Sequence, residues 1–109
     1  MALPRSAVQI LIVLGEGERH GYAIMRSVEA ATAGTVRLGP GTLYTTLARL
    51  EAEGLIEESD TRPDPAVDDQ RRRYWRLTAS GHAVAVEEVR QLAALVERAR
   101  PWALGERPW

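Results

Sequence analysis

Hydrophobic and polar positions along this 109-residue chain follow a helical period in four stretches and a strand period in two. The helical stretches are residues 4–14, 20–32, 40–53 and 78–100, and the strand-like stretches are residues 55–60 and 71–77. Apolar residues three and four apart indicate one buried helix face, whereas alternation by two indicates a strand. The order predicts a mainly α fold of the α+β class, in which three helices precede a hairpin and a long helix.

The third stretch has both ends marked, because Pro40 suits a first helical position and Gly54 suits a left-handed stop. Its leucines share one face for burial, and the opposite face is slim and polar. That outer face holds Gly41, Thr45, Ala48 and Arg49, with Thr42 and Tyr44 on its flanks. A helix of this kind suits a DNA major groove, where side chains reach base edges and phosphates. The alternative is a helix that only covers a core.

The first two helices add two expectations. Residues 4–14, with Gly15 just past the helix end, are apolar almost all the way round, so we expect Val8 and Ile12 to find cover from a second chain. The alternative is a central helix of a monomer. In the second helix, which Gly34 would end, Tyr22 lies in the first turn, where free amides and the helix dipole favour a phosphate.

The hairpin carries the basic cluster of the chain. Its tip, residues 61–70, has two prolines and three aspartates, and its second strand begins with Arg71, Arg72 and Arg73. Alternation places Trp75 and Leu77 on one face of that strand and Arg72, Tyr74 and Arg76 on the other. The arginines suit contacts to a DNA backbone or minor groove, or else pairing with acids of the first strand. Three helices and this hairpin predict a winged helix-turn-helix with a two-stranded wing.

The last helix, capped by Thr78 and ended by Pro101, is long enough to project from so small a domain. Its apolar residues follow the heptad spacing of a helix packed lengthwise on another. We expect a homodimer built from Val8, Ile12, Ala85, Val89, Leu92, Val96 and Ala99. The alternative is a helix folded back on its own domain. The predicted units are residues 1–78 for DNA binding, 79–100 for dimerisation and 101–109 as a tail.

Composition narrows the function further. The formal net charge is −1 and all 14 basic residues are arginine, so a partner would be bound through a local basic patch and not through bulk attraction. The chain has no cysteine, and neither histidine has a motif-spaced partner, so we expect no metal, no cofactor and no enzyme. The N-terminus lacks the pattern of a secretory signal, which favours a cytoplasmic protein.

Three motifs in order resemble the PadR-like transcriptional regulators, specifically the short branch with a single C-terminal helix. They are His20-Gly21-Tyr22, Gly41-Thr42-Leu43-Tyr44 continuing to Gly54-Leu55-Ile56, and Arg72-Arg73-Tyr74-Trp75-Arg76-Leu77-Thr78 with Gly81. In place of the glycine that usually precedes the basic run, this chain has Asp69 and Gln70.

The resemblance implies a dimeric repressor of an inverted-repeat operator, released from DNA by a small hydrophobic or aromatic effector. In drug-sensing relatives the effector stacks on an aromatic of the last helix at the dimer centre. The matching place here is near Leu92, with Val89 one turn earlier, so this pocket would lack the stacking aromatic. The alternative function is a winged helix that docks to a partner protein without specific DNA binding.

Overall fold

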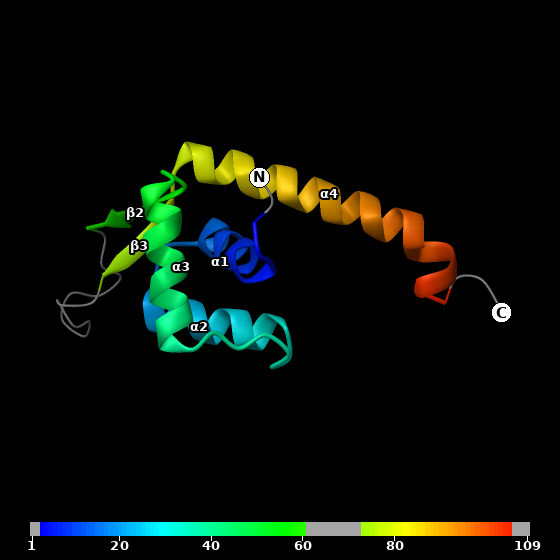
Figure 1. Ribbon diagram of the computed structural model, residues 1–109, viewed down its shortest axis with the longest axis horizontal. Coiled ribbons are helices and arrows are strands. Elements are labelled where there is room, and N and C mark those ends of the chain that lie inside the picture. Colours follow the sequence, from blue (N-terminus) through cyan, green and yellow to red (C-terminus); the bar gives the residue numbers. More distant parts are fainter. Residues whose placement is uncertain (1–2, 61–72, 106–109) are drawn as a thin grey trace.

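The computed structural model describes residues 3–60 and 73–105 and forms a winged helix with a long terminal arm (Figure 1). The elements are α1 (Arg5–Glu16), β1 (Arg19–His20), α2 (Gly21–Ala31), α3 (Pro40–Ala52), β2 (Ile56–Ser59), β3 (Tyr74–Leu77) and α4 (Ala79–Ala103). This order confirms the predicted mainly α winged helix-turn-helix. The two predicted wing strands form as β2 and β3, which pair antiparallel. The sheet has one strand more than predicted, because β1 pairs with the other side of β3 and the order is β1-β3-β2.

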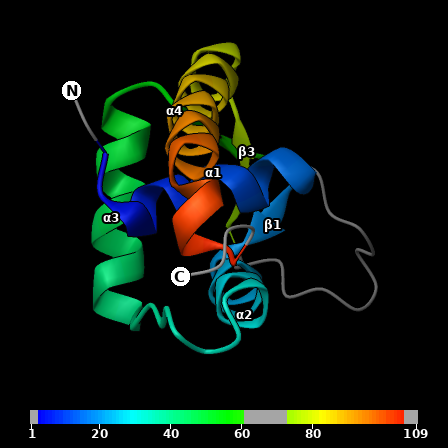
Figure 2. The same cartoon turned by 90° about the vertical axis from the view of Figure 1, so that its right-hand side faces the viewer.

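Helix α1 is the centre of the domain, with α4 above it, α2 below it and α3 to one side (Figure 2). Its buried residues are Ala7, Val8, Ile10, Leu11, Val13 and Leu14. All of these except Val8 join the core formed by the leucines of α3, by Ile24 and Val28 of α2 and by Trp75 of β3. The expectation that α1 requires a second chain for cover was therefore wrong for most of its surface, since the chain's own elements surround it. Ile12 remains half-buried.

The ends of α3 follow the predicted signals. Gly54 has a φ of 76°, and it lies where a backbone turns into the left-handed region that glycine adopts without strain. The amide of Leu55 donates to the Leu50 carbonyl at 2.9 Å, and the amide of Gly54 donates to the Glu51 carbonyl at 3.0 Å. These two bonds are the Schellman pattern, which satisfies the last carbonyls and turns the chain into β2.

Other helix boundaries differ from the prediction. Ala33, with a φ of 52°, takes the left-handed position after α2 that was predicted for Gly34, which follows with a φ of 80°. Helix α1 includes Gly15 and runs to Glu16. Helix α4 does not stop before Pro101 but continues to Ala103. A proline near a helix end removes one backbone hydrogen bond without preventing the last turn from forming.

The short strand β1 could not be recognised in sequence because it has only two residues. Arg19 pairs with Trp75 and His20 with Tyr74, so β3 has a neighbour on both sides. Tyr74, which alternation placed with the outward arginines, is buried, and the His20 ring packs edge-on against it at 5.3 Å between centroids. Trp75 lies in the core. The side chain of Arg19 also donates to the Val13 carbonyl at the end of α1, at 2.7 Å.

Helix α4 begins on the domain and then leaves it. Thr78 caps it as predicted, since its hydroxyl accepts from the Gly81 amide at 3.0 Å. The molecule measures 57 × 27 × 24 Å, and the long dimension follows α4 (Figure 1). Among the described residues, no helix is long and apolar enough to cross a membrane.

Candidate nucleic-acid interface

Helix α3 presents its polar face at the edge of the molecule, with no described element on the outer side (Figure 2). Leu43, Leu47 and Leu50 are buried beneath it. The residues predicted to face a major groove are all exposed, namely Gly41, Thr42, Thr45 and Arg49. A Cβ atom added at Gly41 would meet nothing within 4 Å, so the start of this helix is slim and open.

The start of α2 holds the predicted phosphate contacts Tyr22 and Tyr44 close together. Tyr22 is 56% exposed and Tyr44 is 53% exposed, values that are high for large aromatic side chains. The ring of Tyr44, from α3, lies against Gly21, where an added Cβ would be 2.8 Å from the phenol oxygen. His20 caps this helix end by accepting from the Ala23 amide at 3.2 Å. The Tyr44 hydroxyl therefore lies at the start of α2, which is the positive end of the helix dipole and a place that favours an anion, and Tyr22 belongs to the first turn of the same helix.

Arg26 belongs to the same surface and was not singled out from the sequence. It is exposed one turn after Tyr22, and its guanidinium lies 5.9 Å from the centre of the Tyr22 ring. The signal was available, because residues four apart on a helix share a face. Arg26 extends the basic character of this surface along α2.

Arg73 links the wing to α3. Its guanidinium lies over the Trp75 ring, 4.7 Å from the centroid, and pairs with Glu58 of β2 at 3.1 Å. The hydrogen bond that Arg73 donates to the Glu58 carboxylate raises the pKa of Arg73, and the negative charges of Glu58 and Glu51 act in the same direction. Arg73 is therefore tied to β2, the strand that packs against α3.

The wing arginines are paired with acids in the free protein, which is the alternative that the sequence left open. Arg76 pairs with Glu57 at 2.8 Å, and this contact raises its pKa. On α3, Arg49 pairs with Glu53 at 3.2 Å. Such exposed pairs contribute little to stability, so a phosphate can replace the carboxylate at little cost. Arg71 and Arg72 lie outside the described residues.

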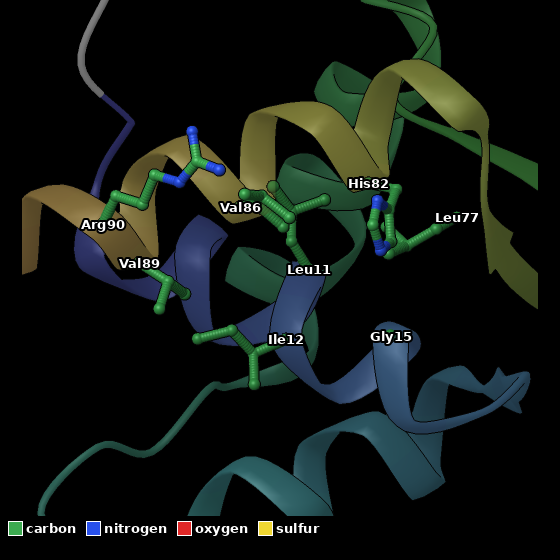
Figure 3. Close-up of a pocket in the computed structure, with 9 residues that line it drawn as sticks. Leu11, Ile12, Gly15, Leu77, His82, Val86, Val89 and Arg90 are labelled. Atoms are coloured by element: carbon green, nitrogen blue, oxygen red, sulfur yellow. The ribbon is translucent and has the colours of Figure 1, made fainter. Parts of the chain in front are cut away.

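A second surface lies between α1 and α4. It is an open, mostly apolar cavity of about 300 Å³, in which Leu11 and Ile12 of α1 face Val86 and Val89 of α4 (Figure 3). Val89, one of the two residues predicted for an effector pocket, lines this cavity. Leu92, the other, is not among the residues that line it. No described aromatic ring other than the His82 imidazole lines the cavity.

The residues predicted for a dimer interface divide into two groups. Val8 and Ala85 are buried by the chain itself and have little surface left for a partner. Ile12, Leu92 and Ala99 are half-buried, whereas Val89 and Val96 are exposed. The available apolar surface therefore lies on α4, with Ile12 as the contribution of α1.

A winged helix with a slim polar helix beside an arginine-bearing wing defines the protein as a DNA-binding regulator of the winged-helix class. The chain belongs to the PadR family: the model described as "Transcriptional regulator PadR-like family" matches residues 10–87. Members of this family are DNA-binding regulators and not enzymes. Among the described residues, no group of three or more histidine, aspartate or glutamate side chains is placed to hold a metal ion.

The relatives include regulators of similar length. Transcriptional regulator Rv3488 of Mycobacterium tuberculosis is 37% identical over 91 residues, covering 84% of this chain and 80% of the relative. An uncharacterized 37.1 kDa protein in transposon TN4556 of Streptomyces fradiae is 37% identical over 89 residues, and the chain spans only 23% of its length. A PadR family transcription regulator from Clostridium difficile shares the fold, with a TM-score of 0.72, 20% identity and coverage of 91% and 98% of the two chains.

Proposed function

We propose that this protein is a homodimeric transcriptional repressor that binds an inverted-repeat operator near a promoter. The observation that carries the proposal is the exposed polar face of α3, which packs beside β2, the strand whose Glu58 pairs with Arg73 of the wing. A partner protein would be a poorer match to this face, because its exposed residues are small or polar apart from Tyr44.

The contacts divide by what each residue can reach. Thr42, Thr45 and Arg49 would lie in the major groove, and Gly41 would let the helix approach the bases closely. Tyr22 and Tyr44 would hold a phosphate at the start of α2. Arg73, with Arg71 and Arg72, would contact the backbone or minor groove beside the wing.

Residues 1–78 would form the DNA-binding domain, and α4 would form the dimerisation arm, which ends at Ala103 and not at Arg100. Two-fold symmetry of the dimer would place the half-sites one helical turn apart, at ~10 bp or a multiple of it. Residues 101–103, which were predicted as part of the tail and include Trp102, then belong to the arm.

An effector that releases the repressor would bind in the apolar cavity between α1 and α4, against Val89. The cavity of about 300 Å³ has the size for a small hydrophobic molecule, and its apolar lining selects such a molecule over a polar one. An effector bound there would abolish operator binding and would leave the stability of the protein unchanged or raise it.

The test is a salt titration of binding to the protein's own upstream promoter DNA and to a scrambled duplex of equal length. We expect the promoter to be preferred by ~1000-fold or more. Arg49→Ala should lose roughly 1–3 kcal/mol of binding to the promoter and little to the scrambled duplex, as expected for a base contact. Arg98→Ala, at an exposed arginine of α4, is the matched control and should change neither.

The proposed wing contact of Arg73 is tested separately. Arg73→Ala should weaken binding to both duplexes and lower the salt slope by about one, because a phosphate contact is independent of sequence. Glu58→Gln should strengthen binding to both, since it removes the carboxylate that competes for Arg73. If Arg73→Ala leaves affinity and salt slope unchanged, the wing assignment is wrong. Repression itself is measured by transcription from the promoter in vitro, which should fall as the operator is filled.

A further inference from the structure

The polar row of α3 ends in an ion pair. Exposed residues at intervals of four form one row along α3 and its C-cap, namely Gly41, Thr45, Arg49 and Glu53. The side chain of Arg49 donates from Nε to a carboxylate oxygen of Glu53 at 3.2 Å. The arginine that is proposed to read a base is therefore held by the last residue of its own row.

Helix stability gives no reason for an acid at position 53. A negative charge at the C-terminus of a helix is unfavourable, because the dipole has its negative end there. An arginine that precedes its acid by four residues is also the weaker order of such a pair. On a surface that faces DNA, the same carboxylate repels phosphates. The contact of Glu53 with Arg49 is the one favourable interaction that the structure shows for this carboxylate.

This contact leaves the outer edge of the Arg49 guanidinium available. A guanidinium donates from Nε and from both terminal nitrogens. The bond to Glu53 is made through Nε, and no group in residues 3–60 or 73–105 accepts a hydrogen bond from either terminal nitrogen of Arg49. Arg73 of the wing differs, because its terminal nitrogen Nη2 donates to Glu58. Arg49 is thus fixed at one edge and presents two parallel donors at the other.

Two parallel donors match guanine, whose N7 and O6 atoms accept side by side in the major groove. We infer that Glu53 is a positioning residue for DNA reading: its carboxylate holds Arg49 so that both terminal nitrogens donate to a guanine of the operator. This inference rests on the proposed function and names the base that is read and the residue that orients the reader.

The Arg49 side chain is held more firmly than another paired arginine near the same helix. Its ion pair measures 3.2 Å and the side chain is 41% exposed, whereas Arg37 lies 3.8 Å from Glu29 and is 76% exposed. An arginine without a tether loses more rotamer freedom when it binds a base, and it reaches phosphates of any sequence as readily. Glu53 therefore favours the operator over other DNA.

Specificity is measured as the ratio of affinities for the protein's own promoter duplex and for the scrambled duplex. Glu53→Ala should lower this ratio by about tenfold, because Arg49 loses its tether. Glu53→Gln removes the same charge but should keep the ratio within about threefold of the parent, since the amide oxygen still accepts from Nε. Glu51→Ala is the matched control, because it removes one exposed carboxylate from α3 that does not pair with Arg49, and it should leave the ratio unchanged.

The base is tested with a promoter duplex in which 7-deazaguanine replaces every guanine, so that the N7 acceptor is absent. The parent should bind this duplex about tenfold more weakly than the unmodified promoter, whereas Arg49→Ala and Glu53→Ala should lose less than about threefold. Equal losses in all of these proteins would overturn guanine as the base that Arg49 reads.

The double variant Arg49→Ala/Glu53→Ala shows whether Glu53 acts through Arg49. Its ratio should equal that of Arg49→Ala alone, because removal of the reader makes its tether irrelevant. A further loss in the double variant would overturn the positioning role, and so would equal losses for Glu53→Ala and Glu53→Gln, which would show an effect of charge. Far-UV circular dichroism confirms that each variant folds.

Failure of the positioning role and failure of the proposed function give different results. A parent protein that binds the promoter and the scrambled duplex equally contradicts the proposed function, and the inference falls with it. A parent that prefers its promoter while Glu53→Ala keeps the full preference contradicts only the role of Glu53.

Discussion

At the scale of single residues, Gly21 shows how a glycine can position a functional side chain. The Tyr44 ring occupies the space where any other residue at position 21 would place its Cβ atom. This contact links the beginning of α2 to the exposed face of α3. The sequence contains both residues in its motifs, but nothing in their spacing shows that they touch.

Gly21→Ala should therefore displace Tyr44 and weaken DNA binding while leaving the fold intact. The flexible end of the tyrosine side chain can move aside, so thermal unfolding should change little. The loss of one phosphate contact predicts roughly 1 kcal/mol of binding free energy, measured by titration with the promoter duplex. Tyr44→Phe should cost a similar amount, and the double variant should cost no more than either change alone, because both remove the same contact.

At the scale of elements, the junction of α3, the sheet and α4 is held by backbone contacts. Thr78 donates its hydroxyl to the Gly54 carbonyl at 2.6 Å, and its amide donates to the Leu55 carbonyl at 3.1 Å. Gly81, in the first turn of α4, lies directly on Leu55: an added Cβ would be 1.9 Å from that carbonyl oxygen. This junction sets the direction in which α4 leaves the domain.

Gly81→Ala should destabilise the protein by roughly 1–3 kcal/mol or more, because a backbone carbonyl cannot move aside as a side chain can. Chemical denaturation measures the change. Gly41→Ala is the matched control, since Gly41 also lies in the first turn of a helix but faces open space. That change should stabilise the fold by about 0.5–1 kcal/mol. A Gly81→Ala variant as stable as the parent would show that α4 can leave the domain in another direction.

At the scale of the whole molecule, the domain and the arm are separable in their roles. Among the described residues, Ala85 is the last that joins the core, so the outer part of α4 contributes nothing to it. The arm beyond Val86 is mostly exposed and extends the molecule to 57 Å. Stability of the domain and affinity for a two-half-site operator should therefore respond to different parts of the chain.

A chain that ends at Arg90 should fold, sediment as a monomer and bind the operator about a hundredfold more weakly than the parent, because the second half-site no longer adds avidity. A duplex with a single half-site should bind the shortened and parent chains about equally. These outcomes are read from circular dichroism, sedimentation and DNA titration. A shortened chain that remains dimeric would mean that α1 holds the dimer.

Much of this architecture could be predicted because it is encoded locally. The leucine face of α3, the Gly54 stop, the Thr78 cap and the hairpin order all follow from the spacing of neighbouring residues and from backbone preferences. These signals are short-range, so they are present in the linear sequence. The same short-range signals predicted which face of α3 is polar and exposed.

Other features depended on contacts between residues far apart in the chain. Two-residue β1 exists only because β3 offers it hydrogen bonds, and Tyr74 is buried because β1 covers it. Val8 is covered by the chain's own elements, so the apolar sequence of α1 reflects a central helix. The sequence by itself determined which helices form and which face of α3 is polar, since both depend on local periodicity. Only the tertiary structure decided that α1 is enclosed, that Tyr44 lies on Gly21 and that α4 leaves a hollow beside α1, because packing between distant segments has no local signature.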